Sequence, residues 1–431
     1  MSVYAQRRQS FMERIGPRAV AVIGGKRLTV RNSDVDHRFR QTSDLWYLTG
    51  FTEPDSLAVI APGRAEKLTM FVRPRDPERE TWTGRRAGLD GARSRFGADA
   101  AFSIDAVAAE LPKLLDGAEE VLFIPGDDPE LDRVILGAVA HARQAERRGL
   151  RAPRKLGDLR WTLHEMRLIK DDDALAKMRR AAAVTRDAHT AAMRAARDGV
   201  HEYEIEALID YTFRKAGGHA GYGTIVGGGE NATILHYVDN DRPLEKGELL
   251  LIDAGCEIDG FTADVTRTFP IGAHFSPAQR RCYELVLAVE KACIAGVAPG
   301  NSIDAIHEQA VDLLTRGMLE LGLLKGDKAQ LIAEGAYKRF YMHRTSHWLG
   351  MDVHDVGIYA PDGKSRPLVA GMVLTVEPGL YIAADAPDVA EEYRGIGIRI
   401  EDDILVTANG YENLTIAVPK EIGDLEALTT A

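Results

Sequence analysis

Two aspartates, Asp253 and Asp264, carry the first indication of chemistry in this sequence. The apolar run 249–252 predicts a strand that ends at Asp253, and Asp259-Gly260 predicts a tight turn before a second strand that begins at Asp264. We expect a hairpin in which the two acids face each other or stand one step apart, with side chains roughly 5 Å apart. Ionised carboxylates this close in an apolar setting need a shared proton or bound cations. From the hairpin alone, it is equally plausible that Asp253 is an ordinary acid at a strand end and that Asp264 is an ordinary exposed acid.

The segment that carries Asp253 recurs later in the chain. Residues 242–255 (RPLEKGELLLIDAG) align at an offset of 124 with residues 366–379 (RPLVAGMVLTVEPG). Glu377 is therefore the counterpart of Asp253. A repeat of this length indicates a duplicated structural unit.

Each copy has further polar residues at related places. A histidine precedes each copy, His236 or His354, and a second acid follows on a later strand, Asp264 or Glu401. Segments typical of helices precede both copies. We expect two αββ units related by a pseudo-twofold axis, with their four acids converging in the middle.

Two histidines, His343 and His347, stand four positions apart in HRTSHWLG. This spacing occurs in zinc-binding helices, but Arg344 occupies the position where such a helix needs a catalytic glutamate, so that interpretation fails. A histidine in such a place is otherwise most often a core residue. Near four converging acids we expect His347 to be a neutral nitrogen ligand.

The charges of the acids suggest how many metal ions are bound. Four carboxylates are neutralised by two divalent cations, and oxygen-rich ligation with a single imidazole favours Mn²⁺ over structural Zn²⁺. Co²⁺, Fe²⁺ and Zn²⁺ stay open, since availability decides selectivity in cells. Two such ions can bridge one water, lower its pKa and present hydroxide to a carbonyl that they also polarise. The chemistry predicted is metal-assisted hydrolysis.

Three further residues have no place among the ligands. We assign His354 as a hydrogen-bond donor to the developing oxyanion and His236 as a donor to the amide or to the residue after the cleaved bond. The alternative is that both histidines support the ligands from behind. Arg399 shares strand parity with Glu401, so it either orients a carboxylate ligand or binds substrate.

The composition limits the other classes of function. With 45% hydrophobic and 28% charged residues, a net charge of −11 and a pI near 5.6, the chain is unlike a nucleic-acid or anionic-membrane binder. The three cysteines have no metal-ligand spacing, and their odd number fits a reducing compartment. The polar N-terminus has no signal-peptide core and no run of about 18 apolar residues occurs, so we expect a cytoplasmic protein.

The length predicts two domains, which we place at residues 1–160 and 161–431. The first is a mixed α/β domain, and 147–155 is its expected linker to the second. In the first domain we expect strands at 19–23, 57–61, 68–72 and 121–124 and helices at 104–115 and 130–147. In the second we expect helices at 172–197, 201–215, 277–295 and 303–321.

Several stretches together resemble a known family. Residues 252–272, 346–357, 374–382 and 395–407 resemble the metal-binding motifs of the pita-bread metallopeptidases, and most closely the Xaa-Pro aminopeptidase (aminopeptidase P) group of the bacterial type. The similarity extends to residues 39–51 and 82–86 of the first domain. It implies an N-terminal α/β domain for substrate access and oligomer contacts, followed by a pseudo-twofold pita-bread catalytic domain.

The resemblance also implies roles for single residues. Asp253 would bind one metal ion, His347 and Glu377 the other, and Asp264 and Glu401 would bridge both. Catalysis would involve His236, His354, Glu377 and Arg399, and the substrate would meet His236, His343, His354, Tyr381, Arg399 and Trp82. Trp82 would reach the site of a neighbouring subunit in a homodimer or homotetramer. The substrate would be a peptide with proline in second position.

Four relatives are alternatives. A prolidase and a methionine aminopeptidase share the five ligands, but the first acts only on dipeptides and the second usually lacks the large first domain. A creatinase-like hydrolase needs no carboxylate quartet. Metal-free relatives that bind peptides or proteins lose ligands, whereas this chain keeps all five.

Overall fold

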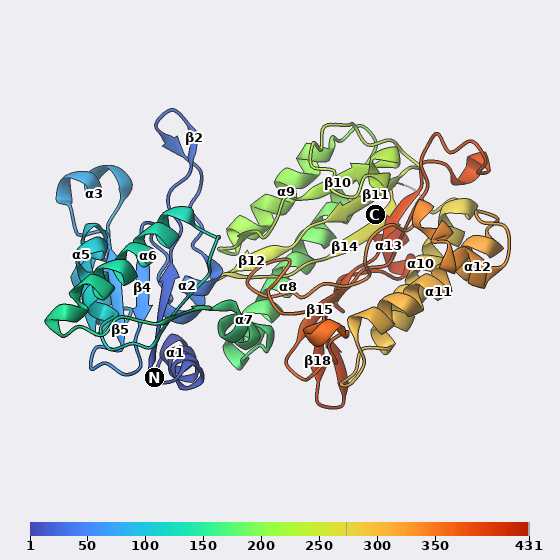
Figure 1. Cartoon of the computed structure of the whole chain (residues 1–431). Helices are drawn as coiled ribbons and strands as arrows, with labels where there is room; N and C mark the ends of the chain where they lie inside the picture. The colour runs from blue at the N-terminus through green and yellow to red at the C-terminus, as the bar shows by residue number, and fades with distance from the viewer. Residues whose placement is uncertain (273, 430–431) are drawn as a thin grey trace. The chain divides into compact units, whose positions relative to one another are not determined.

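The computed structural model describes residues 1–272 and 274–429, and the chain forms two compact units, Met1–Met166 and Arg167–Ala431 (Figure 1). The first unit ends at Met166 rather than at residue 160, within helix α7 (Arg160–Leu168). The segment 147–155, predicted as a linker, instead leads into strand β8 (Lys155–Asp158), which extends the sheet of the first unit.

The first unit is built on a six-stranded sheet in the order β6-β5-β4-β1-β7-β8. Strand β4 runs antiparallel to its neighbours β1 and β5, whereas β5 pairs parallel with β6, and β1 and β8 both pair parallel with β7. All strands except β4 therefore point the same way. Their bounds are β1 Ala19–Gly24, β4 Leu57–Ile60, β5 Leu68–Val72, β6 Ala100–Ser103 and β7 Glu120–Phe123. A separate two-stranded ribbon joins β2 (Val30–Asn32) to β3 (Val35–Asp36).

The helices of the first unit include two that the sequence predicts, α5 (Val107–Leu114) and α6 (Pro129–Gln144), each extended by a short 3₁₀ turn. Helix α1 (Val3–Ile15) was not predicted. Its buried residues are Phe11 and two arginines, so it lacks the apolar stripe that identifies a helix. The other helices are α2 (Ser43–Thr49), α3 (Pro77–Thr83) and α4 (Gly88–Ser94).

The main helices of the second unit begin and end close to the predicted positions. Asp171 caps α8 (Asp172–Ala195), and a capping box formed by Ser276 and Gln279 opens α10 (Pro277–Ala295). The repeat-related helices are α9 (Glu202–Lys215) and α11 (Ile303–Glu320). Shorter helices are α12 (Lys328–Ala333) and α13 (Ile422–Thr429). No helix among residues 1–272 and 274–429 combines the length and hydropathy that a membrane span needs.

Each repeat of the second unit contributes a three-stranded antiparallel sheet, and the pair β11–β14 of the first corresponds to the pair β15–β18 of the second. One antiparallel sheet has the order β10-β11-β14 (Ile225–Gly228, Leu249–Asp253, Thr266–Pro270), and another has the order β15-β18-β19 (Val373–Val376, Asp402–Thr407, Gly410–Asn413). An isolated bridge joins His201 to Pro243 in the first copy and Ser302 to Pro367 in the second, which are the repeat-related prolines. Smaller ladders are β16-β17 (Gly379–Tyr381, Gly397–Arg399) and β13-β12-β9 (Phe261–Thr262, Cys256–Ile258, His219–Ala220).

Strand parity separates the core from the site. In β11, Leu250 and Ile252 pack into the main hydrophobic core. Asp253 has the opposite parity and shares its face with Leu251, which lies in a separate small cluster. The same alternation holds in the second copy, where Leu374, Val376, Ile398 and Ile400 belong to the main core and Thr375, Glu377, Arg399 and Glu401 face the other way. Strands of both repeats therefore present their polar side chains to one place.

Candidate metal centre

The hairpin that carries Asp253 and Asp264 ends in the predicted turn. Strands β12 and β13 are joined by Asp259 and Gly260, whose φ angles are 49° and 81°. Positive φ at both central residues is the conformation that Asp-Gly favours in a two-residue hairpin loop. This part of the sequence analysis is confirmed.

The register of the hairpin differs from the prediction. Asp253 pairs with Thr266, not with Asp264, which stands two residues earlier and outside β14. The ladder is interrupted between β11 and β12, where the chain passes so close to itself that a Cβ on Gly255 would lie 1.8 Å from the Ala263 carbonyl oxygen. Only glycine fits there, and the resulting bend displaces the pairing.

The two aspartates nevertheless meet, through Tyr222. Its hydroxyl lies 2.7 Å from Asp253 Oδ1 and 2.6 Å from Asp264 Oδ1. A phenol carries one hydrogen and can donate to only one of the two acids. Tyr222 therefore holds the Asp253 and Asp264 carboxylates next to each other.

His347 lies between two acids from different repeats. Its Nε2 is 3.3 Å from Asp264 Oδ2 and 3.4 Å from Glu377 Oε1. Its Nδ1 is 3.0 Å from the carbonyl oxygen of Trp348, which fixes a proton on Nδ1 and directs Nε2 towards the acids. Thr375 supports this pair: its hydroxyl donates to Glu377 Oε1 at 3.2 Å and accepts from the His347 backbone N–H.

Glu401 completes the group. Atoms of Asp264, His347 and Glu401 that can bind a metal all lie within 4.8 Å of one another. The Thr266 hydroxyl donates to Glu401 Oε2 at 2.6 Å, and the Glu401 backbone N–H donates to the Thr266 carbonyl. The second repeat is thus joined directly to the strand that faces Asp253.

Arg399 connects the acids to a row of polar rings. Its guanidinium donates to Asp253 Oδ2 at 2.5 Å, to the Thr266 hydroxyl at 2.9 Å and to the Tyr381 hydroxyl at 3.1 Å. The Tyr381 hydroxyl also lies 2.9 Å from His343 Nε2. Arg399 therefore orients Asp253, which is one of the two roles that the sequence left open.

Burial and crowding shift the pKa values of these groups. Burial, with the charges of Asp264 and Asp253, raises the pKa of Glu377 to about 7, against the lowering effect of His347. Burial and the neighbouring acids likewise raise the pKa values of Asp264 and Glu401. Burial opposes the charged form of His347, but Asp264 and Glu377 raise its pKa to about 9. All four pKa values are raised, which means that each group favours additional positive charge in this cluster.

A cavity of about 910 Å³ opens onto this cluster. Its walls include all five predicted ligands and four of the six predicted substrate residues, namely His236, His343, His354 and Arg399. His354 is exposed, with its ring 4.5 Å from that of His347, and His236 is exposed as well. Tyr381 is buried behind the wall, where it touches His343 and Arg399. Trp82 lies in the first unit, in α3, and is 85% exposed.

The chemistry of the donor set suits divalent cations. Four carboxylates and one imidazole with its lone pair directed inward are oxygen-rich ligands of hard to borderline ions. Among the described residues, the basic side chains in contact with these carboxylates are Arg399, His347 and His343. Within the donor set, Asp264, His347 and Glu401 already have ligand atoms close enough together to hold one ion.

Four residues of the site were missed from sequence: Tyr222, Thr266, Thr375 and Asp403. Asp403 is buried and accepts the Asp264 backbone N–H at 3.1 Å. Strand parity could have found Thr375 and Asp403, since they stand two positions from Glu377 and Glu401. No spacing indicates Tyr222, which comes from the loop before β10.

Comparisons with known proteins match nearly the whole chain to one family of enzymes. The model of metallopeptidase family M24 matches residues 176–408, and the model of the aminopeptidase P N-terminal domain matches residues 4–123. The chain is 43% identical to the Xaa-Pro aminopeptidase of Escherichia coli (strain K12), with 99% of this chain and 97% of the relative covered. It is 33% identical to Xaa-Pro aminopeptidase 3 of Homo sapiens, with 99% and 85% covered.

Solved structures give the same result. Aminopeptidase PepP of Pseudomonas aeruginosa superposes with a TM-score of 0.97 at 47% identity, with 99% of this chain and 97% of that one covered. A zinc-substituted Escherichia coli aminopeptidase P in complex with product gives a TM-score of 0.96 at 43% identity, covering 100% and 98%. The predicted fold class and the predicted enzyme class are confirmed. This chain belongs to metallopeptidase family M24, in the form that carries an aminopeptidase P N-terminal domain.

Proposed function

We propose that this chain is an Xaa-Pro aminopeptidase, which hydrolyses the bond between the first residue of a peptide and a proline in second position. The observation that carries the proposal is the cavity of about 910 Å³, because five ligand-type side chains, three further histidines and Arg399 meet in its wall. Relatives that are 43% identical over 99% of the chain bear the name of this activity.

We propose that Asp253, Asp264, His347, Glu377 and Glu401 hold two divalent cations, with Mn²⁺ as the expected metal. Asp253 would belong to one ion, His347 and Glu377 to the other, and Asp264 and Glu401 to both. When bound, such a pair lowers the pKa of a water molecule and polarises a carbonyl. The proposal is supported by the close approach of ligand atoms from Asp264, His347 and Glu401, all within 4.8 Å of one another.

The residues around the ligands prepare and orient them. Arg399 neutralises Asp253 and fixes its direction, and the carbonyl of Trp348 fixes the tautomer of His347. Glu377 lies within reach of His343 as well as His347, and its carboxylate is suited to carry a proton to the leaving amine. His354 and His236, exposed at the cavity, are suited to donate hydrogen bonds to the substrate carbonyl and amide.

Trp82 and the oligomeric state stay predictions. A side chain that is 85% exposed on α3 is available to another molecule. A role at a neighbouring subunit's site requires a homodimer or homotetramer. Sedimentation of the wild-type chain tests this requirement directly.

The experiment is an assay of the purified chain with Mn²⁺ on peptides of increasing length with proline second. We expect release of the first residue from peptides of three residues and longer, and loss of turnover after chelation. Turnover of dipeptides alone would identify a prolidase instead. Absence of turnover with Mn²⁺, Co²⁺, Fe²⁺ or Zn²⁺ would favour a metal-free binding module.

A further inference from the structure

A second cavity, of about 660 Å³, lies entirely in the first unit and shares no residue with the cavity at the acids. It forms at one edge of the six-stranded sheet. Gly24 and Gly25 line it at the end of β1, Arg73 directly after β5, and Asp105 shortly after β6. These strands are mutually parallel, so the cavity lies outside their carboxyl ends, where open α/β sheets bind ligands.

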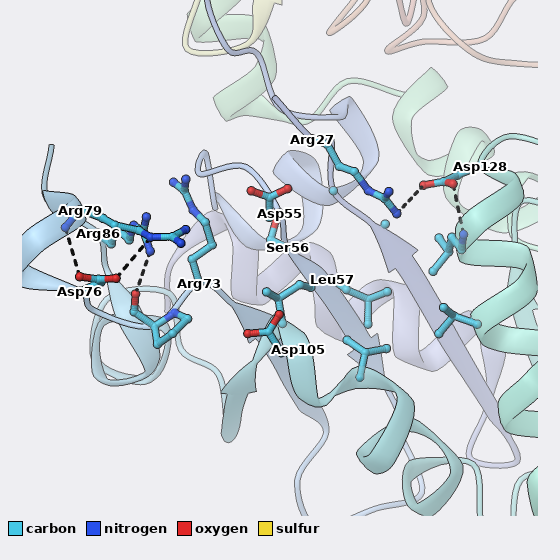
Figure 2. A pocket seen from close by; sticks show the side chains of 17 residues that line it. Arg27, Asp55, Ser56, Leu57, Arg73, Asp76, Arg79, Arg86, Asp105 and Asp128 are labelled. Carbon is cyan, nitrogen blue, oxygen red and sulfur yellow. Dashed lines mark hydrogen bonds and ion pairs between the residues drawn. The ribbon is translucent and has the colours of Figure 1, made fainter. Parts of the chain in front are cut away.

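Two of the four arginines that line this cavity form ion pairs with other described residues, and the other two do not. Arg27 pairs with Asp128 and Glu130, and Arg79 pairs with Asp76. The Nε atoms of Arg73 and Arg86, by contrast, are buried without a hydrogen-bond partner among the described residues. Figure 2 shows Arg73 reaching into the space between the paired groups on either side.

The pKa of Arg73 is consistent with a binding site that lacks an anionic ligand. Burial lowers the pKa of Arg73, and the charge of Arg86 lowers it further, although Asp55 and Glu53 act in the opposite sense. Arg86 donates from Nη1 to the Pro74 carbonyl at 3.3 Å, and this leaves most of its guanidinium available. Two like charges held together at a cavity wall favour an anion, and paired guanidinium groups match a carboxylate.

The acids that line the cavity also form two groups, those with several polar contacts and those with few or none. Asp76 and Asp128 are used as helix caps, because they accept backbone N–H groups at the starts of α3 and α6. Asp55 is half-buried, and its carboxylate has no hydrogen bond or ion pair among the described residues. Asp105 accepts one bond, from the Ser103 hydroxyl at 3.2 Å. A carboxylate without a hydrogen bond, close to two arginines whose Nε atoms have no partner among the described residues, suits a ligand that carries both signs of charge.

Most of the remaining wall is apolar. It includes the side chains of Leu57, Ile104, Val107, Leu131 and Val134, which come from β4, from the 3₁₀ turn and first residue of α5, and from the start of α6. A volume of about 660 Å³ lies within the range typical of small-molecule sites. The cavity therefore offers cationic, anionic and apolar surfaces together.

We propose that this cavity binds an amino-acid or short-peptide zwitterion with an apolar side chain. Arg73 and Arg86 hold its carboxylate, Asp55 holds its ammonium group, and the apolar wall holds its side chain. Inorganic phosphate is a poorer match, because it would place a dianion beside Asp55 with nothing for that carboxylate to bind. The residues that would hold it are all different from those of the cavity at the metal centre.

The test measures binding without turnover. The full chain with Asp264→Ala, which removes a metal ligand, is titrated calorimetrically with the dipeptide Ala-Leu, with N-acetyl-Ala-Leu and with inorganic phosphate. We expect Ala-Leu to bind, and Arg73→Met and Arg86→Met each to weaken it by about tenfold or more. Arg27→Met is the matched control, since its guanidinium lines the same cavity but is already paired, and it should change affinity by less than about threefold.

The ammonium contact is tested separately. N-acetylation should weaken binding by about tenfold in the parent chain and have little effect in Asp55→Asn, since each change removes the same contact. Arg73→Lys keeps the charge without the planar fork, so it gives an intermediate loss even if Arg73→Met folds poorly.

Three outcomes would overturn the proposal: phosphate binding as tightly as Ala-Leu, affinity that does not respond to Arg73 or Arg86, or no binding up to about 10 mM. None of them bears on peptide hydrolysis.

Discussion

Replacement of His189 by glutamine tests how the hairpin that carries Asp253 is held. His189 lies in α8 and is completely buried, and its Nε2 is 3.0 Å from the carbonyl oxygen of Ala254, the residue at which the hairpin ladder breaks. Its Nδ1 is buried without a partner among the described residues. Nε2 therefore carries the proton, and a second proton on Nδ1 would place an unpaired charge in the core.

The size of the effect follows from the pKa. Burial lowers the pKa of His189 from 6.5 to about 4, more than the Ala254 carbonyl raises it. Between pH 6.5 and about pH 4, His189 therefore binds a proton in the unfolded chain but not in the folded chain. The free energy of unfolding decreases as the pH falls through this range. At about 1.4 kcal/mol for each pH unit, His189 contributes a loss on the order of 3 kcal/mol by pH 4.

The assay is urea unfolding of the metal-free chain at pH 7, 6, 5 and 4.5. Thiol labelling of Cys256, Cys282 and Cys293 identifies the transition of the second unit, because all three are buried there. The His189→Gln variant can be less stable than the wild type at pH 7. As the pH is lowered, however, its free energy of unfolding should decrease less steeply than that of the wild type. His141→Gln, at an exposed site in the first unit, should leave the profile unchanged. Parallel profiles for wild type and His189→Gln would refute the reasoning.

The other predictions concern the site and the contact between the repeats. Asp264→Ala and Glu401→Ala should each abolish turnover, since each removes a ligand that both ions share; activity within about tenfold of wild type would contradict that role. Tyr222→Phe should lower metal affinity or kcat/KM by about 10 to 100-fold with the circular dichroism spectrum unchanged, and wild-type values for both would exclude a role in orienting the two aspartates. Arg267→Met should lower the free energy of unfolding by about 3 to 5 kcal/mol, because the Asp402 carboxylate that it contacts at 2.6 Å is completely buried. A loss below 1 kcal/mol in urea unfolding would show that Lys420 neutralises that acid alone.

Local rules account for what the sequence predicted well. Helix caps at Asp171 and Ser276 and the Asp259-Gly260 turn depend on a few neighbouring residues, so they could be placed from the sequence. Strand parity placed Arg399 and Glu401 on one face.

Long-range geometry was harder to predict. The hairpin register depends on the close approach of Gly255 to the Ala263 carbonyl, a contact that only the folded chain reveals. Tyr222 reaches the two aspartates from a loop whose path no periodicity describes. Helix α1 is buried through Phe11 and the side chains of two arginines, so it lacks the apolar pattern by which helices are found.

Arg267 is fully buried and donates to the Asp402 carboxylate and to the carbonyl oxygens of Glu401 and Val418. It belongs to the first repeat and its acceptors to the second. If the polypeptide were cut between α10 and α11, one fragment would keep Arg267 with Glu290 of α10 and the other would keep Asp402 with Lys420, so each of these buried groups would lose a partner. Neither fragment should fold by itself, whereas co-expression of the two should restore activity, with the buried ion pair as the interaction that drives complementation.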